Sequence, residues 1–233
     1  MGVALLDRAM EAAADMTQVL IADDHPLFRE ALKGAVRSAL GSPEVFEAAD
    51  VAGLFELLEG HPHADLLLLD LNMPGAQGFS ALIQVRQALP GLPVVVVSAR
   101  EEPSTIRRAL GHGAAGFIPK SARPDVLARA LQLVLDGEIY SPLGGIQPQI
   151  DAEEADLAKR LAELTPQQFR VLGMVCAGLL NKQIAYDLDV SEATIKAHMT
   201  AIMRKLGVQT RTQAVMKVSR LQLDSVDPEG HAS

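Results

Sequence analysis

Charged and hydroxyl side chains stand where four apolar runs of this 233-residue sequence end. In chain order they belong to Asp23 and Asp24, Asp70, Ser98 and Lys120. The leucines before Asp70, in "DLLLLD", have the composition of a strand that is buried on both faces. In an open parallel sheet, ligands bind where the strands finish and the chain turns outward. We therefore expect these five side chains to meet in one crevice.

Such a crevice would suit a phosphoryl group carried on a carboxylate. Three carboxylates repel one another and resist ionisation without a counter-charge. Mg²⁺, which favours carboxylate and carbonyl oxygens, supplies one, and Lys120 supplies a second. Aspartate is a covalent phosphoryl acceptor, and these cations would neutralise the equatorial oxygens of the group in transfer. Asp70 is the best acceptor because it ends the central strand, and Asn72 could offer its backbone carbonyl to the metal.

Each of these residues also has an ordinary interpretation when it is taken alone. Asp24 could cap the next helix, Asp70 could be a turn residue, and Lys120 could be a solvated loop lysine. Ser98 carries no information by itself. Their joint placement at four strand ends favours a shared site. The neighbouring His25 is expected to be a surface loop residue and not a metal ligand.

The first part of the chain alternates short β-branched or leucine-rich runs with amphipathic stretches, as strands and helices would. The predicted strands cover residues 18–23, 44–49, 65–70, 93–98 and 115–120. The predicted helices cover residues 26–40, 51–59, 78–88, 103–111 and 124–136. This alternation predicts an α/β fold, a five-stranded doubly wound parallel sheet with helices on both faces.

Four segments of this region resemble the receiver domain of two-component response regulators. They read "LIADDHPLFREAL", "LLLLDLNMPG", "VVVVSA" and "GAAGFIPKS", and the resemblance covers residues 17–136. It implies that Mg²⁺ is bound by three carboxylates and one backbone carbonyl. These ligands are Asp23, Asp24, Asp70 and the carbonyl of Asn72.

The same resemblance assigns roles in signalling. It implies that Asp70 takes a phosphoryl group from a sensor histidine kinase. Ser98 and Lys120 would complete the switch, and Phe117 occupies the position of its aromatic residue. We accordingly expect no enzyme, beyond a receiver that takes part in its own phosphoryl transfer and dephosphorylation.

Charge is distributed unevenly, which suggests two domains with different partners. Residues 163–220 hold 8 basic and 4 acidic side chains, a net charge of +4. The rest of the chain holds 13 basic and 25 acidic side chains, a net charge of −12. A Gly- and Pro-rich stretch begins at residue 137, so we assign residues 137–160 to a linker with a short helix from residue 153.

An all-helical unit is predicted for residues 161–222, because capping residues punctuate it. Thr165 to Gln168 form a capping box with Pro at the first helical position. Asn181 is expected to cap a short helix over 182–188, and Ser191 a longer one that ends at Gly207. Thr210 with Gln213 opens the last helix.

The helix after Ser191 has two contrasting faces. One carries an apolar stripe, formed by Ile195, Met199, Ile202 and Leu206. The other is small, polar and basic, a surface that can enter the major groove of DNA. A lysine also stands at the start of the preceding short helix, where free N–H groups could hold a phosphate. The candidate DNA-contacting residues are Lys182, Thr194, Lys196, Ala197, Thr200, Arg204 and Lys205.

Residues 164–215 resemble the LuxR-type helix-turn-helix domain through "LTPQQ", "GLLNKQIA", "VSEATIKAHM" and "KLGV". This resemblance implies a four-helix unit whose third helix reads double-stranded promoter DNA and whose fourth commonly forms a dimer contact. By analogy with NarL-type response regulators, Lys196, Ala197 and Thr200 occupy base-facing positions. We therefore expect a transcription regulator that forms a homodimer on phosphorylation.

Two other functions stay open at this point. A phosphatase of the haloacid-dehalogenase type also uses a strand-end aspartate, but it needs a second acid where this chain has Asn72. Alternatively, the first domain could be a dimerisation module that does not respond to phosphate.

Composition excludes several classes of protein. A hydrophobic fraction of 48% with 21% charged residues is that of a globular protein. No apolar run approaches the roughly 18 residues that span a bilayer, so we expect no membrane partner. Cys176 is the only cysteine and suits a buried thiol in the reducing cytoplasm. Sixteen residues precede Thr17, and either an alternative start at Met16 or an extra helix over 3–13 could explain them.

Overall fold

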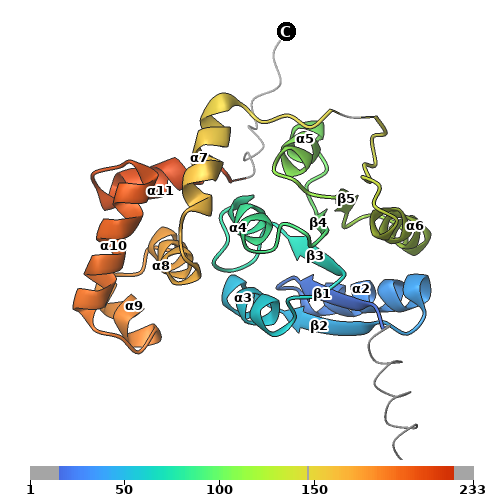
Figure 1. The fold of residues 1–233 in the computed structure, drawn as a ribbon, viewed down its shortest axis with the longest axis horizontal. Helices are drawn as coiled ribbons and strands as arrows, with labels where there is room; N and C mark the ends of the chain where they lie inside the picture. Colours follow the sequence, from blue (N-terminus) through green and yellow to red (C-terminus); the bar gives the residue numbers. More distant parts are fainter. Residues whose placement is uncertain (1–15, 146, 223–233) are drawn as a thin grey trace, which may run out of the picture.

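Five parallel strands form one sheet in the order β2-β1-β3-β4-β5 in the computed structural model, which describes residues 16–145 and 147–222 (Figure 1). The strands are β1 (Gln18–Ala22), β2 (Glu44–Ala48), β3 (Leu66–Asp70), β4 (Val94–Ser98) and β5 (Gly116–Pro119). Each lies within one residue of its predicted bounds. The predicted helix over residues 3–13 lies outside the described part of the chain, and the alternative start at Met16 stays a prediction.

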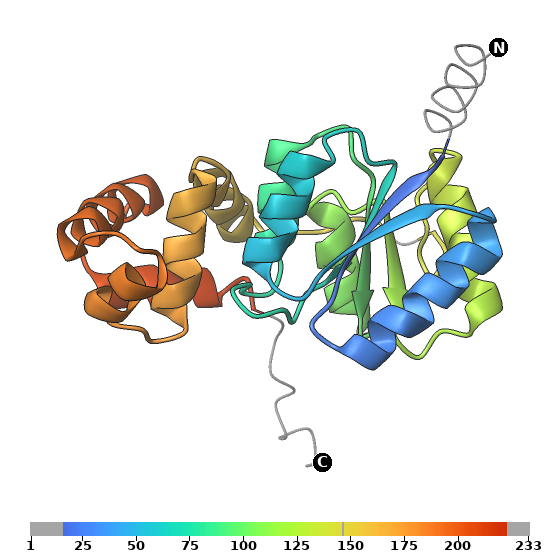
Figure 2. The same ribbon diagram turned by 90° about the horizontal axis from the view of Figure 1, so that it is seen from below.

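Helices cover both faces of the sheet, which confirms the doubly wound fold (Figure 2). One face is covered by α2 (Pro26–Leu40) and α6 (Pro124–Leu135), and the other by α3 (Val51–Gly60), α4 (Ser80–Ala88) and α5 (Pro103–Gly111). Alternate leucines of β3 enter the two cores: Leu66 and Leu68 face α2 and α6, whereas Leu67 and Leu69 face the other layer. A strand needs leucines on both sides only when both faces are buried.

Strand register brings the polar residues to the same edge of the sheet. Asp70 pairs with Val97, and Ser98 pairs with Pro119. Asp23 directly follows β1, and its backbone N–H donates to the carbonyl of Ala48 at 3.1 Å. The carboxyl ends of the strands therefore converge, as parallel strands with right-handed crossovers require.

The first part of the predicted linker has structure of its own. The N–H of Tyr140 donates to the carbonyl of Ala115, and the N–H of Phe117 donates to the carbonyl of Tyr140, both at 3.0 Å. These bonds cover the free edge of β5, where unpaired backbone groups would otherwise be exposed. The linker then continues into α7 (Ala152–Ala162), which Asp151 caps.

The helical unit contains α8 (Pro166–Cys176), α9 (Asn181–Asp187), α10 (Glu192–Leu206) and α11 (Arg211–Ser219). The capping boxes at Thr165 and Thr210 and the cap at Ser191 are confirmed. Gly207 ends α10 with a φ of 67°, in the left-handed region that favours glycine. Among the described residues, no helix is both long and apolar enough to cross a membrane.

The predicted cap at Asn181 is wrong. Asn181 is already the first residue of α9, and Leu180 precedes it at the capping position. The side-chain oxygen of Gln183 accepts the N–H of Leu180 at 2.7 Å, so the free amide finds its partner from inside the helix. The Asn181 side chain instead accepts a hydrogen bond from Nη1 of Arg211 at 3.1 Å, which ties α9 to α11.

Candidate metal centre and nucleic-acid interface

An acidic cluster lies at the carboxyl edge of the sheet. Asp23 and Asp24 come from the loop after β1, and Asp70 ends β3. Ligand atoms of these three carboxylates and of His25 all lie within 4.8 Å of one another. Asp23 and Asp70 are each only 1% exposed. The structure therefore brings together the acidic residues that the sequence placed at separate strand ends, in a group that could hold a metal ion.

Lys120 bridges two of these carboxylates. Its Nζ lies 2.6 Å from Oδ2 of Asp23 and 2.8 Å from Oδ2 of Asp70. Burial alone would lower the pKa of Lys120, but the two carboxylates outweigh it and raise that pKa above its usual value. Burial raises the pKa of Asp70, and the Lys120 ammonium opposes part of that rise. Lys120 is therefore a fixed positive charge at the mouth of the cluster.

Two oxygens of the cluster are poorly satisfied. Oδ2 of Asp23 and Oδ1 of Asp24 are buried, yet neither makes a hydrogen bond of good geometry with any described residue. Each lies 2.6 Å from a nitrogen, Oδ2 of Asp23 from Nζ of Lys120 and Oδ1 of Asp24 from Nδ1 of His25. Buried carboxylate oxygens are normally satisfied by hydrogen bonds or by a metal ion. This donor set fits a hard divalent cation such as Mg²⁺.

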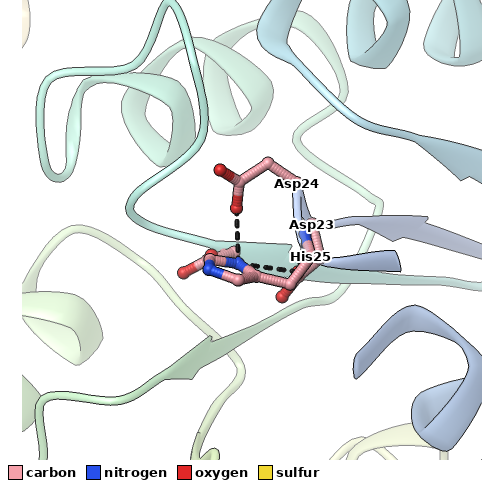
Figure 3. Close-up of side chains that lie close together, drawn as sticks. Asp23, Asp24 and His25 are labelled. Carbon is pink, nitrogen blue, oxygen red and sulfur yellow. Dashed lines mark hydrogen bonds and ion pairs between the residues drawn. The ribbon is translucent and has the colours of Figure 1, made fainter. Parts of the chain in front are cut away.

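His25 lies against the acid pair, as Figure 3 shows. Its Nδ1 is 2.6 Å from Oδ1 of Asp24 and 3.4 Å from Oδ1 of Asp23. Its backbone N–H donates to Oδ1 of Asp23 at 2.7 Å. The side chain is 63% exposed, so His25 is the exposed loop residue that we expected. Its Nδ1 nevertheless lies within 4 Å of both carboxylates.

The three other predicted residues of this site surround the cluster. The backbone N–H of Asn72 donates to Oδ1 of Asp70 at 3.2 Å. Ser98 is fully buried, and its hydroxyl oxygen accepts the N–H of Arg100 at 3.1 Å. Phe117 is fully buried in the core beneath α3, α4 and α5. Asn72 thus contacts the cluster through its backbone, the carbonyl of Ser98 accepts the N–H of Lys120 at 2.7 Å, and Phe117 lies in the core below.

Two residues of α2 that were not predicted from the sequence also support the cluster. Nζ of Lys120 lies 4.8 Å from the ring centroid of Phe28, a cation–π contact. Arg29 donates from Nη1 to the backbone carbonyl of Asp23 at 2.6 Å and from Nε to Glu47 at 3.1 Å. Their position in the first turn of the helix, directly after the Asp pair, is a sequence signal that could have identified both residues. The contact between Arg29 and Glu47 has no such signal, because it depends on the pairing of β1 with β2.

The predicted DNA-reading face of α10 is open to solvent. Ile195, Met199, Ile202 and Leu206 are buried, as the apolar stripe predicted. On the opposite face the exposed candidates are Lys196, Ala197, Thr200 and Arg204, and Lys182 is exposed on α9. Nζ of Lys196 lies 3.3 Å from Glu192, an exposed pair one helical turn apart that contributes little stability.

Two of the predicted DNA contacts are engaged within the helical unit. Nζ of Lys205 donates to the carbonyl of Glu163 and to the side-chain oxygen of Gln168, both at 2.7 Å. Lys205 thus ties α10 to α7 and α8 instead of lying on the open face, because its long side chain reaches back to carbonyls at a helix end. Thr194 is half-buried, and its hydroxyl pairs with that of Ser191 at 2.9 Å.

Comparison with protein families identifies both units. Residues 19–132 match the family model of the response regulator receiver domain. Residues 162–218 match that of the bacterial regulatory proteins of the luxR family. The two matches occur in the same order as the α/β unit and the helical unit.

Several relatives share both units. The glycerol metabolism activator of Pseudomonas putida is 42% identical over 208 residues, which cover 86% of this chain and 94% of the relative. The nitrate/nitrite response regulator protein NarL of Escherichia coli is 32% identical over 205 residues, with the same coverage of each chain. Among solved structures, RcsB of Salmonella typhimurium is 25% identical, with a TM-score of 0.51 over 88% of this chain and 99% of the other.

A structure of two RcsB dimers bound to two DNAs is similar to the same degree, with 25% identity and a TM-score of 0.50 over 88% of this chain and 98% of the other. The family models and the relatives thus agree with each other on both units. The chain belongs to the response regulators, transcription regulators that join a receiver domain to a LuxR-type DNA-binding domain.

Proposed function

We propose that this response regulator is controlled by phosphorylation of Asp70, with a sensor histidine kinase as donor and Mg²⁺ as cofactor. One observation carries the proposal. Lys120 joins Asp23 and Asp70, two buried carboxylates at the edge of the sheet, while Oδ2 of Asp23 and Oδ1 of Asp24 are buried there without a hydrogen bond of good geometry. An arrangement of this kind binds and neutralises a phosphoryl group better than it serves as a structural core.

The residues of the cluster divide the work of phosphoryl transfer. A carboxylate oxygen of Asp70 bonds to phosphorus while the bond to the donor's imidazole nitrogen breaks, and the bonding electrons leave with that nitrogen. Bound Mg²⁺ would be held by Asp23, Asp24, Asp70 and the carbonyl of Asn72, and would neutralise charge on the phosphoryl oxygens. Lys120, whose Nζ lies 2.8 Å from Oδ2 of Asp70, would neutralise further charge on these oxygens. The Ser98 hydroxyl accepts the N–H of Arg100 and keeps its own proton to donate to a phosphoryl oxygen, and the Phe117 ring would move with the loop that carries Ser98.

We further propose that the exposed face of α10 binds promoter DNA as a homodimer. Lys196, Ala197 and Thr200 would face base edges, whereas Arg204 and Lys182 would hold phosphates. The solvent exposure of this face supports the assignment, as do the DNA-bound dimers of RcsB. The proposed units are a receiver over residues 17–136, a linker over 137–160 and a DNA-binding domain over 161–222.

The test treats the full-length chain with acetyl phosphate and Mg²⁺. Sedimentation velocity measures the oligomeric state, and fluorescence anisotropy measures affinity for a duplex selected from a random pool by the phosphorylated protein. We expect phosphodonor to increase both dimerisation and affinity, and chelation of Mg²⁺ to remove both effects. Equal mass and equal affinity with and without phosphodonor would contradict the proposal.

Arg29 provides a more local prediction for the metal site. Arg29→Gln removes the charged donor that holds the Asp23 carbonyl and the ion pair with Glu47. Substitution of a residue that orients a metal ligand typically weakens metal binding by about 10- to 100-fold. We therefore expect the Kd for Mg²⁺ to rise by about tenfold. Calorimetric titration measures this Kd, and Arg37→Gln on the exposed side of the same helix is the matched control. An unchanged Kd in R29Q would show that the acidic loop holds its own conformation.

A further inference from the structure

The receiver and the DNA-binding domain are docked on each other through the linker helix and the end of the last helix (Figure 1). Helix α7 packs against α4, and α8 packs against α3. The N–H of Phe79, at the start of α4, donates to the carbonyl of Leu221 at 3.1 Å, just beyond α11. Leu221 is fully buried. The docking therefore involves the loop that directly follows Asp70, because this loop leads into Phe79.

A buried carboxylate of the linker helix stands at the centre of this interface. Glu154 of α7 is 8% exposed and lies between two cationic or protonatable side chains, one from α5 and one from the residue that directly follows α5. Nε of Arg108 donates to both carboxylate oxygens, at 3.0 and 3.1 Å, and Nε2 of His112 lies 2.6 Å from Oε1. We call these three residues the Glu154 clasp. Removal of one partner from such a group leaves the others buried without compensation.

The charge state of Glu154 supports this role. Burial alone would raise the pKa of Glu154, but the hydrogen bond with His112 and the charge of Arg108 outweigh burial and bring that pKa below its usual value. Glu154 is therefore ionised near neutral pH, and its charge-assisted hydrogen bonds are stronger than those of a neutral pair.

Arg108 extends the clasp from the linker helix to the last helix. Its Nη2 donates to the carbonyl of Arg220 at 2.9 Å, and its Nη1 donates to that of Gln222 at 3.4 Å. Its guanidinium also lies 4.8 Å from the ring centroid of Phe79. One receiver side chain thus holds both α7 and the end of α11. Helix α5 follows Ser98 by a short loop, so it is close to the predicted switch.

A second contact brings the two backbones together at a glycine. A Cβ atom at Gly173 of α8 would lie 2.6 Å from the carbonyl oxygen of Gly75, in the loop after Asp70. Real Cβ atoms do not approach backbone oxygens so closely. Gly173 is helical, where glycine costs roughly 1 kcal/mol relative to alanine, so close packing against the receiver accounts for it better than helix stability does.

The DNA-reading face lies outside this interface. Lys196, Ala197, Thr200 and Arg204 are exposed while the two domains are docked. In Figure 1, α10 lies on the far side of the DNA-binding domain, with α7 and α8 between it and the sheet. The docked receiver therefore leaves this face free to meet a single half-site.

We propose that the Glu154 clasp and the Gly173–Gly75 contact form a lock that fixes the orientation of the DNA-binding domain, so that the receiver controls the pairing of two domains on DNA and not the access of one domain to DNA. This inference rests on the proposed function. Phosphorylation would act on the lock because the Asp70 loop carries Gly75 and Phe79, and α5 with its C-terminal cap carries Arg108 and His112. Two domains bind two half-sites together only when both can take the required orientation.

Two variants open the lock by independent means. Glu154→Ala removes the central charge, and Asp156→Ala on the exposed face of the same helix is its control. Gly173→Ala inserts a Cβ into the interface while it favours α8, and Gly34→Ala in α2, where a Cβ meets nothing within 4 Å, is its control. Hydrogen exchange of α7 amides reports opening, and exchange of β3 amides reports the integrity of the receiver fold.

DNA binding measured without phosphodonor then shows whether the receiver controls the pairing of two DNA-binding domains or the access of one domain to DNA. One probe is a duplex with two half-sites, selected from a random pool by the phosphorylated full-length protein, and the other is the same duplex with one half-site scrambled. We expect E154A and G173A to bind the two-site duplex about tenfold more tightly than the wild type, the change that the loss of one charge-assisted hydrogen bond can produce. Affinity for the single half-site should stay within about twofold.

Three outcomes would overturn the lock. Equal gains on both duplexes would mean that the receiver blocks access, and no gain on either duplex would mean that the docking has no regulatory role. A gain in only one variant would also contradict a single lock, unless β3 exchange shows that the other variant is unfolded, in which case the folded variant decides.

E154A in the Asp70→Asn background should keep its gain. If the wild type does not respond to phosphodonor but E154A and G173A still gain affinity for the two-site duplex, the proposed function fails and the lock stands.

Discussion

Asp70→Asn is expected to abolish the response of the protein to acetyl phosphate in both dimerisation and DNA affinity. The amide cannot bond to phosphorus as a carboxylate does, and it no longer offers the negative charge that Lys120 faces at 2.8 Å. The substitution conserves shape and removes a buried charge whose pKa burial already raises, so the fold should persist. Sedimentation velocity and anisotropy, each with and without phosphodonor, measure the response.

Asp136→Asn, an exposed position at the end of α6, is the matched control and should respond as the wild type does. A D70N protein that still dimerises on addition of phosphodonor would place the acceptor on another residue. A D70N protein whose DNA affinity equals that of the phosphorylated wild type would instead favour a receiver that serves as a dimerisation module without phosphate control.

The second large effect is expected on the open face of α10. The double substitution of Lys196 and Arg204 by alanine removes two exposed positive charges and leaves the buried stripe intact. We expect each lost contact to cost about 1–3 kcal/mol, so DNA affinity should fall by about 30-fold or more. The dependence of log K on log salt should also become shallower, since fewer counterions are released. Anisotropy titrations at several salt concentrations measure both.

Arg123 and Arg129, two exposed arginines of the receiver, provide a control with the same loss of charge when both become alanine. That variant should bind DNA within about threefold of the wild type, because general electrostatic attraction falls off within a Debye length of about 10 Å. Equal losses in the two double variants would show that overall charge, and not the α10 face, determines affinity.

The sequence predicted the sheet well because local and tertiary preferences agree there. The "LLLLD" run can be satisfied only by a strand covered on both sides, and β3 is that strand. Helix ends were equally predictable where a side chain caps its own helix, as at Thr165, Ser191 and Thr210. Asp23, Asp24, Asp70 and Lys120 could be grouped in advance, because parallel strands finish at one edge.

Contacts between distant elements could not be predicted in the same way. Asn181 has the residue type of a cap but pairs with Arg211, and Lys205 has the type of a DNA contact but pairs with Gln168. The sequence shows which groups a residue can bind, whereas packing determines which of them it meets. Glu154 illustrates the limit: nothing in the pattern of α7 distinguishes it from the exposed Glu153 beside it, and only docking buries it.

The chemical nature of the modified residue is the most direct test of the central claim. The full-length protein is treated with acetyl phosphate and Mg²⁺ and then reduced with borohydride, which converts an aspartyl phosphate to homoserine, and the peptides are sequenced by mass spectrometry. We expect homoserine at position 70 alone, and none when Mg²⁺ is chelated. Homoserine at Asp23 or Asp24, or no modification with Mg²⁺ present, would contradict the assignment of Asp70 as the phosphoacceptor.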